Sequence, residues 1–120
     1  MFRDAQEFNG KIDQWDMSSA TSLAGMFFSA TAFNQDIGDW NTASGTDFSR
    51  MFSHASSFNQ PIGGWDTANA VTMLAMFTNA ANFTQDLSGW CVQHIPEIPD
   101  RLSTHSALSA HHHPVWGTCP

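Results

Sequence analysis

The stretch from Met51 to Asp66, MFSHASSFNQPIGGWD, decides the fold, because related stretches begin at residues 1, 26 and 76. The copies are spaced by 25 residues, with no insertion or deletion between them. A fixed period between about 20 and 50 residues is typical of repeat proteins, in which each unit buries its apolar side against its neighbours. We therefore expect residues 1–90 to form about 3.5 tandem units and residues 91–120 to form a C-terminal cap.

The apolar positions recur in columns, which we predict to be the structural core. Leu23, Met26, Phe27 and Ala30 are spaced i, i+3, i+4 and i+7, which places side chains on one face of a helix. The same columns continue along the chain as Met26, Phe27, Ala30, Phe33, Ile37, Trp40, Met51, Phe52, Ala55, Phe58, Ile62, Trp65, Met76, Phe77, Ala80, Phe83, Leu87 and Trp90.

These patterns predict one helix of about ten residues in each unit, a length that is marginal outside a tertiary structure. Residues 37–40 and 62–65 read as short strands or extended turns, and strands in successive units would stack about 4.8 Å apart into a narrow parallel sheet. The predicted fold class is therefore an α/β, leucine-rich-repeat-like solenoid with an irregular C-terminal cap. Residues 103–110 are expected to form a helical turn within the cap.

Composition and charge exclude several classes of function. The net charge is -7, and only Arg3, Lys11, Arg50 and Arg101 are positive. Binding to nucleic acid needs clustered Lys and Arg, and an anionic membrane surface needs a basic amphipathic face, so neither partner is expected. No apolar run approaches the roughly 18 residues of a membrane span, so membrane insertion is not expected either.

Cys91 and Cys119 are the two cysteines of the chain and bracket the predicted cap. The simplest interpretation is a disulfide, which would also place the protein outside a reducing cytosol. The alternative is a structural zinc site that combines Cys91, His94 and Cys119. That alternative has less support, because the second half of such a site lacks a paired spacing. His111 to His113 are interpreted as an ordinary polar loop.

Two further columns allow either a structural role or a role in ligand binding. Trp15, Trp40, Trp65 and Trp90 could stack on sugar rings, but each follows an aliphatic residue by three positions, which favours a place in the core. Asp16, Asn41 and Asp66, with Asp36 and Asp86 nearby, could form a calcium ladder. They lack the Gly-x-Asp density of calcium-binding repeats, so we interpret them as turn residues.

No catalytic constellation, phosphate-binding loop or metal-protease motif appears in the sequence. A catalytic site also needs singular residues in unlike environments, which a repeat does not supply. We predict that the protein is not an enzyme, and we predict no cofactor.

The unit MF-x2-A-x2-FNQ-x-I-x2-W-[DN] resembles the short tandem repeats of BspA-like bacterial surface proteins, a divergent leucine-rich-repeat-like group. The stretches 26–40, 51–66 and 76–90 carry the likeness, and the ending of the chain from Trp90-Cys91 to Pro120 is similar to the terminal cap of such arrays. The resemblance implies a secreted or surface-anchored protein that binds other proteins, often in adhesion.

We therefore expect an extracellular or cell-surface module for protein–protein interaction. Because residue 1 already lies inside a repeat, we also expect the chain to be the C-terminal part of a longer array. The alternatives are a carbohydrate-binding module that uses the Trp column and a structural spacer within a longer surface protein. The expected binding face is polar and consists of Gln35, Asp36, Asp39, Gln60, Gln85 and Asp86.

Overall fold

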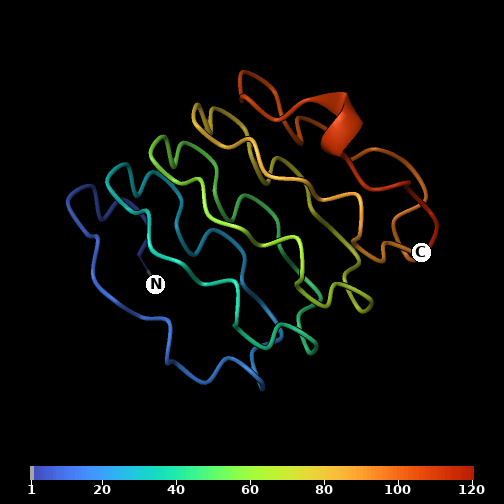
Figure 1. The fold of residues 1–120 in the computed structure, drawn as a ribbon, viewed down its shortest axis with the longest axis horizontal. Helices are drawn as coiled ribbons and strands as arrows, with labels where there is room; N and C mark the ends of the chain where they lie inside the picture. Colours follow the sequence, from blue (N-terminus) through green and yellow to red (C-terminus); the bar gives the residue numbers. More distant parts are fainter. Residues whose placement is uncertain (1) are drawn as a thin grey trace.

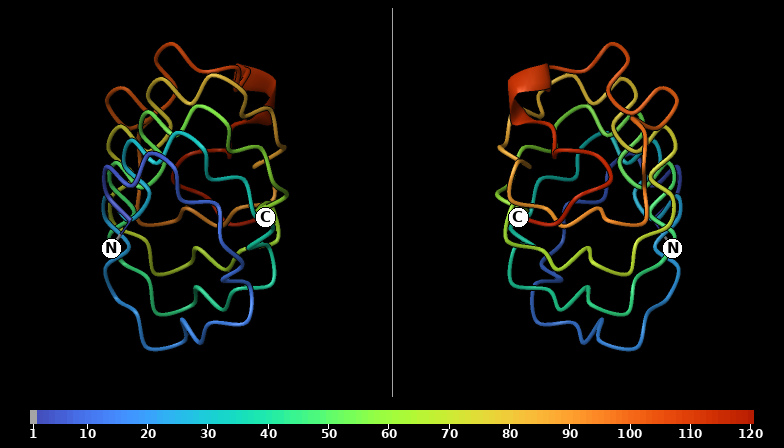
Figure 2. Two further views of the ribbon diagram at one scale, coloured as in Figure 1. Left: turned by 90° about the vertical axis from the view of Figure 1, so that its left-hand side faces the viewer. Right: turned by 90° about the vertical axis from the view of Figure 1, so that its right-hand side faces the viewer.

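The computed structural model describes residues 2–120 and shows a chain wound into successive coils that lie side by side from the N-terminal to the C-terminal end (Figure 1). Viewed from two sides, successive coils follow similar outlines (Figure 2). The one named element is the 3-10 helix η1, Ala110–His112. Two isolated parallel bridges join Ser22 to Asp47 and Asp47 to Thr72. Residues 2–120 contain no α-helix and no continuous sheet.

The prediction of an α/β solenoid was therefore wrong. The segments expected to be helical are runs of tight turns. The segments expected to be strands are turns as well, because the Trp40 N–H donates to the Ile37 carbonyl at 3.1 Å and Trp65 repeats this bond with Ile62. The helical turn expected over 103–110 is replaced by the short η1 at its C-terminal edge.

The backbone hydrogen bonds explain why no helix forms. The Phe28 N–H donates to the Gly25 carbonyl at 3.1 Å and the Ala30 N–H to the Phe27 carbonyl at 3.0 Å, which closes successive four-residue turns. The Phe27 N–H instead donates to the Met51 carbonyl of the next coil at 2.9 Å. An α-helix uses every interior N–H within its own segment. Here alternate N–H groups point to the neighbouring coil, so the coil-to-coil ladder replaces the helix.

Left-handed residues permit this alternation. Two backbone positions in the turns of each coil have φ between 54° and 63°, and they form the columns Gly25, Arg50, Ala75, Arg101 and Asp4, Ser29, His54, Asn79, His105. The left-handed conformation costs about 1–2 kcal/mol for a residue with a Cβ. The hydrogen bonds between coils offset this cost. A backbone N–H that is buried without a partner loses its hydrogen bond to water and gains none in return.

Stacked aromatic rings form the core beneath these turns. The ring centroids of Phe27, Phe52 and Phe77 follow one another at 5.5 and 5.6 Å with nearly parallel planes. A second ladder from Phe33 through Phe58 to Phe83 repeats at 5.8 and 5.9 Å. Every residue of the expected core is 6% exposed or less. Offset stacking of aromatic rings adds to the free energy gained by burying them.

The coils approach one another closely at Gly63. A Cβ at this position would lie 2.5 Å from the Asp86 carbonyl oxygen of the next coil. At the adjacent Gly64 a Cβ would meet nothing within 4 Å. Gly63 therefore permits the close spacing between coils, whereas Gly64 faces open space.

The segment 91–120 covers the last coil. The Leu87 N–H donates to the His112 carbonyl at 2.8 Å, and the Val92 N–H donates to the Thr118 carbonyl at 2.9 Å. Leu102 and Leu108 are buried, so the segment supplies apolar side chains to the end of the core. In the part of the chain that the structure describes, no helix is long and apolar enough to cross a membrane.

Candidate binding surfaces

Three members of the expected binding face are engaged in the structure. The Gln60 amide donates from Nε2 to both the backbone carbonyl and Oδ1 of Asn34 at 3.1 Å. Gln35 makes the same pair of bonds to Asn9, as does Gln85 to Asn59. These glutamines are half-buried. Their N–H groups therefore tie one coil to the preceding one and are not free to bind a partner.

The acidic members of that face are exposed. Asp36 and Asp86 each accept, through Oδ1, the N–H two residues ahead, from Gly38 and Ser88, at 2.9 Å. The bonds from Ser88 lower the pKa of Asp86 below its ordinary value. Asp39 is exposed as well. This face consequently offers carboxylate oxygens to solvent and few free donors.

The Asp column forms local turns. Asn41 accepts the Ala43 N–H through Oδ1, and Asp66 accepts the Ala68 N–H in the same way, each at 3.1 Å. Asp16 accepts from both the hydroxyl and the backbone N–H of Ser18, and these bonds lower its pKa. Each is the Asx-turn in which the side chain satisfies a backbone group two residues on. Within residues 2–120 no three His, Cys, Asp or Glu side chains gather as a metal site would need.

The Trp column lies in the core. Trp40 and Trp65 are 4% exposed and Trp90 is 1% exposed. Each indole N–H donates to a carbonyl of the preceding coil at 3.0 Å, and the acceptors are Ile12, Ile37 and Ile62. Trp15, at the start of the column, is 40% exposed. A sugar ring can therefore reach one indole of the column, not a row of them.

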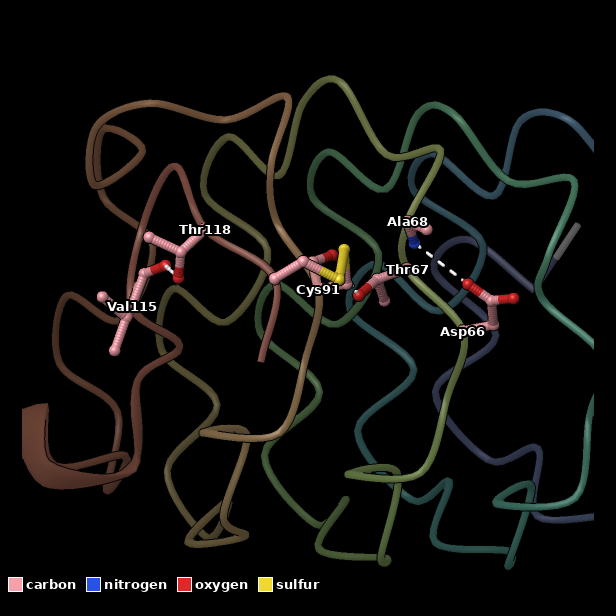
Figure 3. The surroundings of a disulfide bond; sticks show 7 residues. Asp66, Thr67, Ala68, Cys91, Val115 and Thr118 are labelled. Carbon is pink, nitrogen blue, oxygen red and sulfur yellow. Dashed lines mark hydrogen bonds between the residues drawn. A yellow bond between two sulfur atoms is a disulfide. The ribbon is translucent and has the colours of Figure 1, made fainter.

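Cys91 and Cys119 form a disulfide, with their Cα atoms 4.1 Å apart (Figure 3). The Thr67 hydroxyl donates to the Cys91 carbonyl at 2.8 Å, which links the bridge to the preceding coil. Both sulfur atoms are used in this bond, so they are not thiolates that could bind zinc. His94, the third residue of the alternative zinc site, is exposed.

The histidine run separates into different environments. His111 is exposed, whereas His113 is half-buried. The His113 ring lies edge-on to the Trp116 ring, with the two ring centroids 6.2 Å apart. His113 Nε2 lies 3.2 Å from the Ser103 hydroxyl oxygen. Burial lowers the pKa of His113 below its ordinary value of 6.5. His113 is therefore part of the packed cap rather than of a free polar loop.

This burial predicts that stability decreases in mild acid. As the pH falls below about 6.5, the unfolded chain protonates His113 before the folded chain does. The unfolded state then binds more protons, so the free energy of unfolding falls as the pH moves from about 6.5 toward the folded-state pKa. Urea denaturation at pH 7.5 and 5.5 should show a smaller loss for His113→Gln than for the wild type. The exposed-site control His94→Gln should retain the wild-type loss, and equal losses in all three proteins would contradict the prediction.

Sequence reasoning missed a groove of about 360 Å³ on the turn edge of the coils. Its lining is polar and includes two arginines, a histidine, an aromatic ring and one carboxylate. The lining residues are Phe28, Arg50, Ser53, His54, Leu74, Ala75, Thr78, Asp100 and Arg101. The sequence carried little sign of this groove. Arg50 and Arg101 are 51 residues apart, one more than two periods of 25, so the fixed period alone does not place them in one column.

Comparison with known proteins gives one match. The family described as "Mycoplasma protein of unknown function, DUF285" matches residues 1–115. No curated protein and no solved structure matches the chain. The match covers the repeats and most of the segment that follows them.

Proposed function

The chain belongs to the DUF285 family, and from that premise we propose that it is an extracellular or cell-surface module for protein–protein interaction and adhesion. The resemblance of its repeat to those of BspA-like surface proteins supports this role. The proposal makes the protein a non-catalytic binding module without a cofactor, and one part of a longer repeat array.

The observation that carries the proposal is the contrast between the interior and the surface of the coils. Inside, the aromatic columns stack, and none of the buried side-chain nitrogen or oxygen atoms described for residues 2–120 lacks a hydrogen-bond partner. Outside, polar side chains repeat at each coil on a frame held by coil-to-coil bonds. A rigid frame lowers the entropy that a binding surface loses when it meets a partner.

The Cys91–Cys119 disulfide supports the proposed location. Structural disulfides persist in oxidising compartments, outside the cytosol. The low share of charged residues, 12%, fits a surface built from Asn, Gln, Ser and Thr. Burial of Trp40, Trp65 and Trp90 favours a protein partner over a carbohydrate, because the column is not available for stacking on sugars.

The test is a binding panel with the oxidised protein, residues 1–120. Purified matrix proteins, host-cell surface proteins and glycans are measured by biolayer interferometry up to about 100 µM, the weak end of useful affinity. Saturable binding to a protein, abolished by heat unfolding of the module, is the expected result. Binding to glycans alone would favour a carbohydrate-binding module, and no binding to any member would favour a spacer; either outcome would count against the proposal.

A further inference from the structure

The groove gathers the scarce positive charge of this acidic protein. Arg50 and Arg101 line it, and the guanidinium carbon of Arg3 lies 4.3 Å above the ring of Phe28, which also lines it. Three of the four Lys and Arg residues of the chain are therefore in or beside one groove. The fourth, Lys11, falls in the column of Asp36 and Asp86 when the 25-residue period is applied, and no member of that column lines the groove.

The repeat geometry explains why the groove is hollow. Arg50, Ala75 and Arg101 occupy the same left-handed position in three successive coils. Coils paired as parallel strands lie about 4.8 Å apart, so the two arginine backbones are separated by about 10 Å. Ala75 lies between them, is 7% exposed and has a single-carbon side chain. The small Ala75 side chain therefore leaves a depression between the longer side chains of Arg50 and Arg101.

The remaining lining groups suit a polar ligand of low charge. The His54 ring lies edge-on to Phe28, with centroids 5.6 Å apart, and Asn79 Nδ2 lies 3.4 Å from its ring nitrogens. Ser53 and Thr78 also line the groove, and the Thr78 hydroxyl donates to the backbone carbonyl of Arg101. Asp100 is the one acidic residue of the lining, and its carboxylate opposes a ligand with dense negative charge.

We propose that this groove binds a segment of a partner protein that carries one or two carboxylates, held by Arg50 and Arg101. This inference rests on the proposed function and names the chemistry of the partner. The planar guanidinium fork matches a carboxylate with two parallel hydrogen bonds. A polyanion such as a sulfated glycan fits less well, because the net charge of -7 and Asp100 both repel it.

The test uses two synthetic peptides and the oxidised protein. One peptide carries two glutamates separated by two neutral residues, which spans about 10 Å when extended; the other has glutamine in place of both. Titration up to about 5 mM, followed by amide chemical shifts, should show the glutamate peptide shifting signals of Arg50, His54 and Arg101. The glutamine peptide should cause no such shifts. Equal binding of the two peptides would overturn the proposal.

Variants separate the groove from the general charge of the protein. Arg50→Gln and Arg101→Gln should each weaken binding of the glutamate peptide about fivefold, as expected for exposed charge-assisted pairs. Asp100→Asn should strengthen it about twofold, and the matched control Lys11→Gln should leave it unchanged. A loss with Lys11→Gln as large as with Arg50→Gln would show non-specific attraction and overturn the proposal. The proposal would also be overturned if a heparin fragment bound more tightly than the glutamate peptide and if that binding were weakened by Arg50→Gln.

The two proposals fail in different ways. A panel protein whose binding is unaffected by Arg50→Gln and Arg101→Gln would overturn the groove inference and leave the interaction function intact. A glutamate peptide that binds in the groove, together with no panel protein that binds, would support the groove chemistry and count against the proposed function.

Discussion

Phe52→Ala is expected to lower the free energy of unfolding by about 4 kcal/mol, because truncating a fully buried phenylalanine costs about 3–5 kcal/mol. Phe52 is fully buried, and its ring stacks on Phe27 at 5.5 Å, on Phe77 at 5.6 Å and on Phe58 at 4.3 Å. The variant removes the middle ring of a ladder that joins three coils, so Phe27 and Phe77 each lose one stacking partner. Urea denaturation of the oxidised protein measures the change.

Two further variants control this experiment. Trp15→Ala removes a larger ring that is 40% exposed and has Phe2 as its aromatic neighbour at 5.5 Å, so a loss of about 1 kcal/mol is expected. Phe52→Leu retains most of the buried volume and should cost about 1.5 kcal/mol, which keeps the site measurable if the alanine variant does not fold. Equal losses for Phe52→Ala and Trp15→Ala would show that the ladder does not hold the coils together.

Removing the disulfide with Cys91→Ser and Cys119→Ser together should lower the free energy of unfolding by about 3–4 kcal/mol. The two cysteines are 28 positions apart, and a cross-link that closes a loop of this length restricts the unfolded chain by about that much. Urea denaturation, compared with the wild type under oxidising and reducing conditions, measures the effect. The reduced wild type should match the double variant.

Thr67→Val is the control for the disulfide experiment. It removes the hydroxyl that donates to the Cys91 carbonyl at 2.8 Å and leaves the bridge intact, so about 1 kcal/mol is expected. Hydrogen exchange locates the change, because the Val92 N–H is bonded to the Thr118 carbonyl beside the bridge and should exchange faster in the cysteine variant. If the oxidised wild type and the double variant unfold at the same urea concentration, the bridge does not stabilise the folded chain.

The buried columns followed from the sequence because burial in a repeat depends on position within the unit. Phe33, Phe58 and Phe83 recur every 25 residues, and a side chain that repeats at one position in stacked units meets its own copies. This holds whatever the local backbone conformation. The structure accordingly stacks these rings at 5.8 and 5.9 Å.

The secondary structure did not follow, because the spacing of Leu23, Met26, Phe27 and Ala30 fits two different backbones. A helix places these residues on one face through bonds within the segment. Consecutive turns, interrupted by the left-handed Gly25 and Ser29, bury the same residues. The choice depends on whether the Phe27 N–H finds an acceptor four residues earlier or in the next coil, and the sequence of one unit does not contain that information.

The expected binding face likewise could be located from the sequence, whereas its contacts could not. Gln35, Gln60 and Gln85 were chosen as repeated polar residues, and their amides are bonded to asparagines of the preceding coil. A ladder of this kind and an exposed row produce the same sequence pattern. Repetition therefore identified the column but not the direction in which its donors point.

The sequence by itself determined the 25-residue unit, its apolar columns and the pair of cysteines that closes the C-terminal segment, because these depend on which residues recur and on which do not. The tertiary structure alone decided that the coils of residues 2–120 lack α-helices, that the glutamine amides bond to the preceding coil and that Arg50 and Arg101 flank a groove over Ala75. The physical reason is that each of these features depends on contacts between coils. Alternate N–H groups find their acceptors in the neighbouring coil, and residues far apart in sequence become neighbours only when the coils stack.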